Sequence, residues 1–319
     1  MRSSLVMDHD YLPIAKQVTQ YYHGKDIANL KGEKDMKIVH TSVKGSNSWN
    51  EDALIIHNKE QVYGVIDGAT SLIPFTGTNG ETGGYLASRI IANTLDRIMS
   101  QQEHETIPLT EALMVANREL RMEMLNYDID LKHKEVLWSA CAAIIRINEY
   151  SIEFAQVGDC MIIAVYADGL IRVITRDQLA HVDQETYRLW AEGLAEGLTS
   201  RQELWDHVKA QIVKGRQLTN TPSGYAVLNG EPEVADYMES GRINRINLKA
   251  ILLMTDGLYL PKRANEKLFD AMEVTKLVMK QGLEPYISGV IELEENDPEC
   301  HIYPRVKTSD DKTAIWIEL

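Results

Sequence analysis

Five separated segments of this chain place acidic residues at the end of an apolar, β-prone run. They are Asn50-Glu51-Asp52, Ile66-Asp67-Gly68, Val157-Gly158-Asp159, Met254-Thr255-Asp256-Gly257 and Ser309-Asp310-Asp311. A single Asp-Gly at a strand end is ordinary turn chemistry, because Asp hydrogen-bonds its own backbone and Gly accepts a positive φ. Several such carboxylates that converge in one fold repel one another unless cations compensate them. Since hard oxygen ligands suit Mg²⁺ or Mn²⁺, the pattern indicates a site for one of these ions.

The spacing of apolar residues predicts strands first, then helices, then strands again. The predicted strands lie at 37–43, 52–57, 61–66, 139–147, 152–157, 161–166, 170–174, 250–254 and 313–317. Amphipathic helices are predicted from Gly83, between Leu113 and Met124, and over 265–280. We interpret the four runs between 139 and 174 as one antiparallel meander. Connections of hairpin length favour antiparallel sheets covered by helices over a doubly wound parallel sheet.

One stretch of the chain reads as an insertion. Residues 175–217 are polar and helical, and a cluster of turn residues at 220–224 precedes a short apolar run. We interpret residues 175–245 as an inserted subdomain of a main domain that spans 37–319. Residues 1–36 are then an N-terminal extension.

The charge balance limits the classes of partner. The 319 residues include 33 basic and 47 acidic side chains, a formal net charge of −14, which disfavours binding to nucleic acids and to anionic membranes. The cysteines Cys141, Cys160 and Cys300 lack metal-ligand spacing and are predicted to be reduced core residues. The first 11 residues lack the apolar region of a signal peptide, and no run reaches about 18 apolar residues. These features predict a cytoplasmic protein.

Five motifs, in chain order, resemble those of the metal-dependent type 2C (PPM) protein phosphatases, in the style of the bacterial members. They are Asn50-Glu51-Asp52-Ala53, Val62-Tyr63-Gly64-Val65-Ile66-Asp67-Gly68, Val157-Gly158-Asp159, Leu253-Met254-Thr255-Asp256-Gly257 and Asp310-Asp311-Lys312-Thr313. The resemblance extends from about residue 37 to residue 319. It implies an α+β fold, a four-layer α-β-β-α sandwich of two antiparallel sheets flanked by helices. It also implies a site for two Mn²⁺ or Mg²⁺ ions at one end of the sandwich.

The resemblance assigns roles to single residues. Asp67 matches the carboxylate that bridges both ions, and Gly68 matches the residue whose backbone carbonyl contacts one of them. Asp256 and Asp310 match the remaining ligands of the other ion. Together with Asp52, these three aspartates are the predicted catalytic residues.

Three further acidic residues complete the implied metal site. Glu51 and Asp52 match the pair that orders metal-bound water. Asp159 matches a ligand of a weaker third ion found in some bacterial members, but Leu260 stands where many members have an aspartate that helps to hold that ion. Two ions are therefore expected, and the third is left open.

The chain departs from the family pattern around the expected phosphate. Asn47 stands four residues before Glu51, where the family usually has an arginine that binds phosphate in a bidentate fork. Lys44 is a candidate substitute, although a solvated surface lysine is the simpler interpretation. Ala69-Thr70 replaces the common His-Gly, which removes a possible general acid.

The leading functional hypothesis is hydrolysis of phosphoserine and phosphothreonine in proteins by a water that two metal ions activate. The expected partner is thus a phosphorylated protein, selected by the insertion. A pseudophosphatase that serves as a binding or regulatory module is an alternative, because the arginine and histidine are missing. A phosphatase of small phosphorylated metabolites is another.

Overall fold

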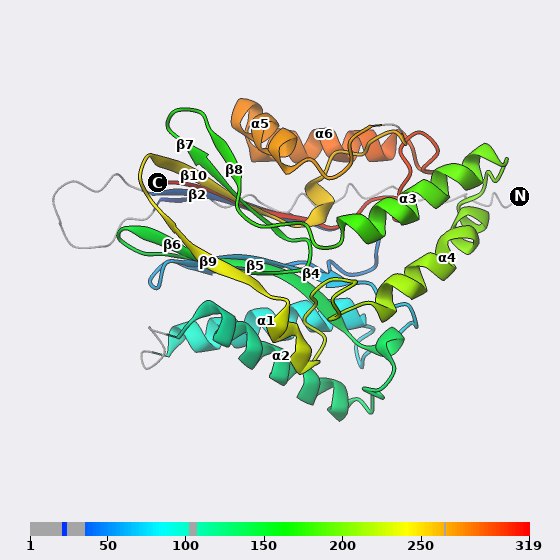
Figure 1. The fold of residues 1–319 in the computed structure, drawn as a ribbon, viewed down its shortest axis with the longest axis horizontal. Coiled ribbons are helices and arrows are strands. Elements are labelled where there is room, and N and C mark those ends of the chain that lie inside the picture. Colours follow the sequence, from blue (N-terminus) through cyan, green and yellow to red (C-terminus); the bar gives the residue numbers. More distant parts are fainter. Residues whose placement is uncertain (1–20, 24–35, 102–106, 265) are drawn as a thin grey trace, which may run out of the picture.

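Two antiparallel sheets pack face to face between two layers of helices (Figure 1). The computed structural model describes residues 21–23, 36–101, 107–264 and 266–319. Most of the predicted N-terminal extension over 1–36 lies outside these residues. The expected α+β sandwich is confirmed.

The first sheet has six strands, with the C-terminal strand near its centre. In spatial order they are β1 (Tyr21–His23), β2 (Lys37–Val43), β11 (Lys312–Glu318), β10 (Leu248–Met254), β7 (Met161–Tyr166) and β8 (Ile171–Val173). β11 pairs antiparallel with β2 on one side and with β10 on the other. The last strand of the chain therefore joins the first well-formed strand to the rest of the sheet.

The second sheet has five strands. Their order is β3 (Ala53–His57), β4 (Val62–Ala69), β5 (Ser139–Ile147), β6 (Ser151–Val157) and β9 (Glu239–Asn244). β5 is buried along its whole length, which explains its apolar and small residues, among which Arg146 is the exception. One face of this sheet packs on the first sheet through residues such as Val65, Ile145, Ile251 and Ile315.

Helices cover the outer face of each sheet. The helices α1 (Gly83–Ser100) and α2 (Leu109–Asn126) lie on the five-stranded sheet, and α5 (Ala271–Gln281) and α6 (Leu283–Glu295) lie on the six-stranded sheet (Figure 1). The helices α3 (Ala180–Ala195) and α4 (Arg201–Gln217) form a hairpin beyond one end of the sandwich. Within the described residues, no helix is both long enough and apolar enough to cross a bilayer.

A small core of its own holds the α3–α4 hairpin in place. Trp190, Leu204, Val208 and Cys300 are fully buried against one another. The indole Nε1 of Trp190 donates to the carbonyl of Cys300 at 3.1 Å, so the loop between α6 and β11 contacts the hairpin directly. Within the predicted insertion over 175–245, β9 pairs with β6 as part of the second sheet. The boundaries of that subdomain stay a prediction.

The predicted antiparallel meander over 139–174 is wrong. β6 and β7 belong to different sheets, and the chain crosses between the sheets at residues 158–160. Gly158 has a φ of +84°, and a Cβ there would lie 2.2 Å from the Sγ of Cys141. The short connection between β6 and β7 has the length of a hairpin but leads from one sheet to the other, and the positive φ of Gly158 permits this path.

Among the strands and α-helices, β1, β9 and α6 escaped the sequence analysis, and one helix begins later than expected. β9 is polar because most of its residues are exposed at the edge of the sheet, and α6 carries Pro285 in its first turn. α5 begins at Ala271 and not near 265, because Asp270 accepts hydrogen bonds from the backbone N–H groups of Met272 and Glu273. The three cysteines are buried and free, as expected.

Candidate active site

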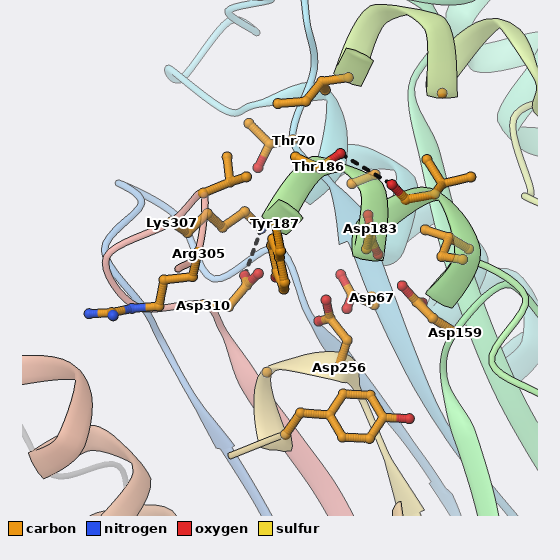
Figure 2. Close-up of a pocket in the computed structure, with 18 of the residues that line it drawn as sticks. Asp67, Thr70, Asp159, Asp183, Thr186, Tyr187, Asp256, Arg305, Lys307 and Asp310 are labelled. Atoms are coloured by element: carbon orange, nitrogen blue, oxygen red, sulfur yellow. Dashed lines mark hydrogen bonds and ion pairs between the residues drawn. The ribbon is translucent and has the colours of Figure 1, made fainter. Parts of the chain in front are cut away.

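The predicted catalytic aspartates gather at the end of the sandwich that the α3–α4 hairpin covers. Asp67 lies near the end of β4, Asp256 opens the 3₁₀ turn η4 (Asp256–Leu258) directly after β10, and Asp310 precedes β11. Figure 2 shows the three carboxylates pointing into one space. They line a cavity of about 630 Å³. The ends of central strands from both sheets therefore converge on one site.

Burial and mutual repulsion act together on these acids. Burial raises the pKa of Asp67 well above its usual value, and the charges of Asp52 and Asp256 raise it further. Burial likewise raises the pKa of Asp256, with Asp310 adding to the effect. Buried carboxylates that repel one another favour protonation or a nearby cation. The cavity is thus built to receive positive charge.

Asp52 belongs to this cluster without lining the cavity. Its side chain is buried, and its Oδ2 accepts a hydrogen bond of 2.9 Å from the hydroxyl of Thr255. Burial raises its pKa well above the usual value, and the charges of Asp311 and Asp310 raise it further. Asp52 therefore adds negative charge near Asp67 without lining the cavity.

Glu51 does not line the cavity, and its carboxylate joins the neighbouring loops. Its carboxylate accepts hydrogen bonds from Thr82 Oγ1 at 2.5 Å, Thr70 Oγ1 at 2.7 Å and Asn47 Nδ2 at 3.0 Å. Three donors occupy most of the acceptor sites of a carboxylate. Its predicted part in ordering water stays a prediction.

The loop over 44–51 is held by the residue after Asp310. Asp311 accepts hydrogen bonds from the backbone N–H groups of Gly45 at 2.6 Å and Glu51 at 2.7 Å. Asn47 lines the cavity. Lys44 lies outside the cavity wall, and its Nζ donates to the carbonyl of Asn47 at 2.8 Å. The predicted substrate contact of Lys44 stays a prediction.

Asp159 reaches the cavity from the crossing between the two sheets. Its side chain is buried, and its Oδ1 has no hydrogen-bond partner among the described residues. Burial raises its pKa well above the usual value, and the charges of Asp256 and Asp177 add to this effect. An unpartnered buried oxygen beside other carboxylates is suited to a cation. Leu260 also lines the cavity.

The α3–α4 hairpin and the loop before β11 add residues that the sequence analysis did not single out. Asp183 and Tyr187 lie one helical turn apart on α3 and both line the cavity (Figure 2). Lys307 places its Nζ 2.6 Å from Asp310 Oδ1. The i, i+4 spacing of Asp183 and Tyr187 was visible in the sequence. The contact of Lys307 depends on the path of its loop.

A family model for protein phosphatase 2C matches residues 41–299. The chain belongs to the protein phosphatase 2C family. A search of curated proteins gave no match.

Solved structures of bacterial protein phosphatases share this fold. Stp1 from Staphylococcus aureus is 16% identical, with a TM-score of 0.55 over 92% of this chain and 99% of that chain. PstP/Ppp from Mycobacterium tuberculosis is 15% identical, with a TM-score of 0.52 over 89% and 98% of the two chains. The PstP catalytic domain in complex with two manganese ions is 14% identical, with a TM-score of 0.52 over 89% and 97%. At these identities the likeness establishes the fold alone.

The donor chemistry of this protein phosphatase 2C chain fits a hard divalent cation. The cavity is lined by oxygen donors from Asp67, Asp159, Asp256 and Asp310, and one oxygen of Asp159 is unpartnered. No group of three or more His, Cys, Asp or Glu side chains in the described part of the chain has the spacing of an assembled metal site. In this arrangement the ammonium of Lys307 supplies the positive charge beside Asp310.

Gly68 permits the close packing beside these donors. Its N–H donates to the carbonyl of Glu51 at 3.1 Å. A Cβ at this position would lie 2.2 Å from the carbonyl oxygen of Gly84 and 2.6 Å from that of Glu51. A larger residue would therefore push β4 away from α1 and displace Asp67.

Proposed function

We propose that this chain is a Mn²⁺- or Mg²⁺-dependent phosphatase that removes phosphate from phosphoserine and phosphothreonine in proteins. The observation that carries the proposal is the convergence of Asp67, Asp256 and Asp310 in one cavity, where burial raises the pKa of both Asp67 and Asp256. A chain without a use for cations would gain by replacing such acids, because their repulsion destabilises the fold. Membership of the protein phosphatase 2C family supports the same reaction.

Each residue of the site has a separate part in the proposed reaction. Asp67 would hold two ions, with the carbonyl of Gly68 on one of them and the carboxylates of Asp256 and Asp310 on the other. Asp52, which is buried and acts on Asp67, would add negative charge to the site. Two bound ions supply a nucleophilic water at neutral pH and offset the charge on the transferring phosphoryl group. The PstP catalytic domain, which was solved with two manganese ions, supports this number.

No side-chain nucleophile is required. Cys141 lines the cavity and Cys160 follows Asp159, but burial raises the pKa of both thiols well above the usual value. The thiolate is the reactive form of cysteine, so neither thiol is suited to attack phosphorus. Water is therefore the nucleophile in the proposed reaction.

The hairpin suits the selection of a protein substrate. α3 and α4 line one side of the cavity, through residues such as Tyr187 and Trp205. We propose phosphorylated proteins as substrates and a cytoplasmic location, with neither nucleic acid nor membrane as a partner. The net charge of −14 supports the last point.

An activity assay tests the proposal. Purified protein is incubated with p-nitrophenyl phosphate and with phosphoserine and phosphothreonine peptides, in Mn²⁺, in Mg²⁺ or in EDTA. We expect turnover of the peptides in Mn²⁺ or Mg²⁺ and none in EDTA. Turnover that is confined to small phosphorylated metabolites would favour the metabolite phosphatase. Metal binding without turnover of any phosphoester would favour the pseudophosphatase.

A further inference from the structure

Five cationic side chains line the acidic cavity, and they differ in what neutralises them. They are Arg201, Arg216, Lys262, Arg305 and Lys307. Lys262 pairs with Glu273 at 2.7 Å, Arg305 with Asp297 at 2.7 Å and Lys307 with Asp310 at 2.6 Å. Figure 2 shows the guanidinium of Arg305 directed away from Asp67 and Asp256. Three of the five charges are therefore already compensated within the protein.

The two remaining arginines lie at opposite ends of α4. Arg201 is its first residue and Arg216 its penultimate one. Fifteen residues of α-helix separate them by about 22 Å along the axis. Arg201 donates to the carbonyl of Val306 at 2.7 Å, at the outer end of the hairpin. Only Arg216 is close to the end of β4.

Neutral groups orient the guanidinium of Arg216. Its Nη1 donates to the hydroxyl of Ser139 at 2.7 Å, and its Nη2 donates to the carbonyl of Thr70 at 3.1 Å. Its printed hydrogen bonds go to these two neutral oxygens and to no carboxylate of the described residues, whereas a guanidinium has five N–H donors. Three N–H groups are therefore left for a further acceptor. Arg216 and Thr70 both line the cavity. Burial raises the pKa of Asp183 on α3, and the charge of Arg216 opposes that rise, so the guanidinium acts on an acid of the same cavity.

Arg216 also approaches the corner of the cavity that Asn47 occupies. The amide of Asn47 donates to the hydroxyl of Thr70 at 3.2 Å, while Arg216 contacts the carbonyl of the same residue. Asn47, which stands where the family usually has an arginine, and Arg216 on α4 thus contact the same residue, Thr70.

We propose that Arg216 binds the phosphate of the substrate, and that α4 thereby supplies the guanidinium that the loop over 44–51 lacks. The inference rests on the proposed phosphatase function. A planar fork of N–H donors matches two phosphate oxygens, and Ser139 and Thr70 hold it in place before the substrate arrives. Because the hairpin carries this group, docking of α4 and binding of phosphate are coupled.

A purely structural role for Arg216 predicts a different result. A cation in the last turn of α4 interacts favourably with the helix dipole, and its two hydrogen bonds join α4 to Thr70, which follows β4, and to Ser139 of β5. Loss of that role would lower stability and leave the affinity for phosphate unchanged. The experiment must therefore separate charge from hydrogen bonding.

The test uses Arg216→Gln, which keeps an amide donor and loses the charge. Lys262→Gln is the matched control, because it removes one cation that also lines the cavity but is paired with Glu273. We measure kcat and KM for p-nitrophenyl phosphate in Mn²⁺, the inhibition constant of inorganic phosphate, and the melting temperature. For Arg216→Gln, KM and the inhibition constant should rise at least about tenfold, with kcat far less affected. Asn47→Arg in the Arg216→Gln background should restore part of the loss.

Unchanged KM and phosphate inhibition in a folded Arg216→Gln variant would overturn the inference. If that variant fails to fold, Arg216→Lys keeps the charge and loses the fork, and a rise in KM then supports the proposal while an unchanged KM overturns it. If the wild type hydrolyses no phosphoester, titration calorimetry with inorganic phosphate in Mn²⁺ decides separately. If Arg216→Gln loses phosphate binding and Lys262→Gln keeps it, Arg216 binds phosphate although the chain is no phosphatase. If the wild type binds no phosphate, both the role of Arg216 and the proposed phosphatase function are rejected.

Discussion

Lys312 Nζ lies 2.7 Å from Glu294 Oε2, in an ion pair whose side chains are 1% and 7% exposed. The same ammonium donates to the carbonyl of Asp310 at 2.8 Å, and the hydroxyl of Ser309 donates to Glu294 at 2.7 Å. The pair thus holds the backbone of a predicted metal ligand against α6. Burial raises the pKa of Glu294, while Lys312 opposes that shift.

Removing one partner of this pair should be costly. Lys312→Met is expected to lower the free energy of unfolding by about 3–5 kcal/mol, because it leaves the carboxylate of Glu294 buried and unpaired. The double variant Lys312→Met/Glu294→Leu should regain most of that loss. Urea unfolding of the two variants and the wild type measures both values. Equal losses in the single and double variants would show that the unpaired charge is not the cause.

Asp67→Asn should abolish phosphatase activity and leave the fold intact. The change removes a charge that the pKa shift shows to be repelled by Asp52 and Asp256, so the melting temperature in EDTA should stay the same or rise. Activity in saturating Mn²⁺ and the melting temperature in EDTA are the measurements. Asp168→Asn is the control, because Asp168 only accepts a hydrogen bond from the N–H of Leu170 in an exposed turn. Near wild-type turnover in the Asp67 variant would remove Asp67 from the mechanism.

Divalent metal should stabilise the wild-type protein. A ligand that binds only the folded state at a hundredfold excess over its Kd adds about 2.7 kcal/mol. The melting temperature should rise with millimolar Mn²⁺ and fall again with EDTA, and Asp67→Asn should lose most of this response. A wild-type melting temperature indifferent to Mn²⁺, Mg²⁺ and EDTA would argue against a clustered metal site.

The stability of the metal-free protein should depend on pH through Asp177. Burial raises the pKa of this carboxyl from 3.8 to about 6, so the folded state holds a proton that the unfolded state has lost. Stability from this group is full below about pH 4 and is lost as the pH rises through 6. Asp177→Asn keeps an acceptor for the N–H groups of Leu179 and Ala180. Because the amide does not titrate, this variant should not lose stability over that pH range. Its free energy of unfolding relative to wild type should rise between pH 4.5 and 7.5 in urea titrations with EDTA, whereas parallel curves would contradict the assignment.

The strand ends were predictable because their signals are local. Alternating and continuous apolar runs place most of the strands within a residue or two, and acids at the ends of these strands reach one cavity. The local pattern was therefore enough to locate Asp67, Asp256 and Asp310 at strand ends, and the family resemblance grouped them. Their spatial grouping follows from sheets that bring strand ends together.

Contacts between distant segments were not predictable. Nothing near Gly158 distinguishes a crossing from a hairpin, and Glu51 reads as a site acid although Asn47, Thr70 and Thr82 occupy its oxygens. Arg216 lies 146 residues from Thr70 in the chain, and no local pattern links them. The sequence therefore indicates which acids meet, but not the cations that meet them.

The bond between Asp311 and Gly45 closes a loop of 266 residues, and β11 fills the place between β2 and β10. Contacts of such separation form late, because the loss of chain entropy precedes the gain from pairing. During synthesis, β2 cannot join its sheet until β11 has emerged, and the loop over 44–51 lacks its anchor until Asp311 follows. The wall of the cavity that Asp310 and the loop over 44–51 provide is therefore completed only when β11 is inserted.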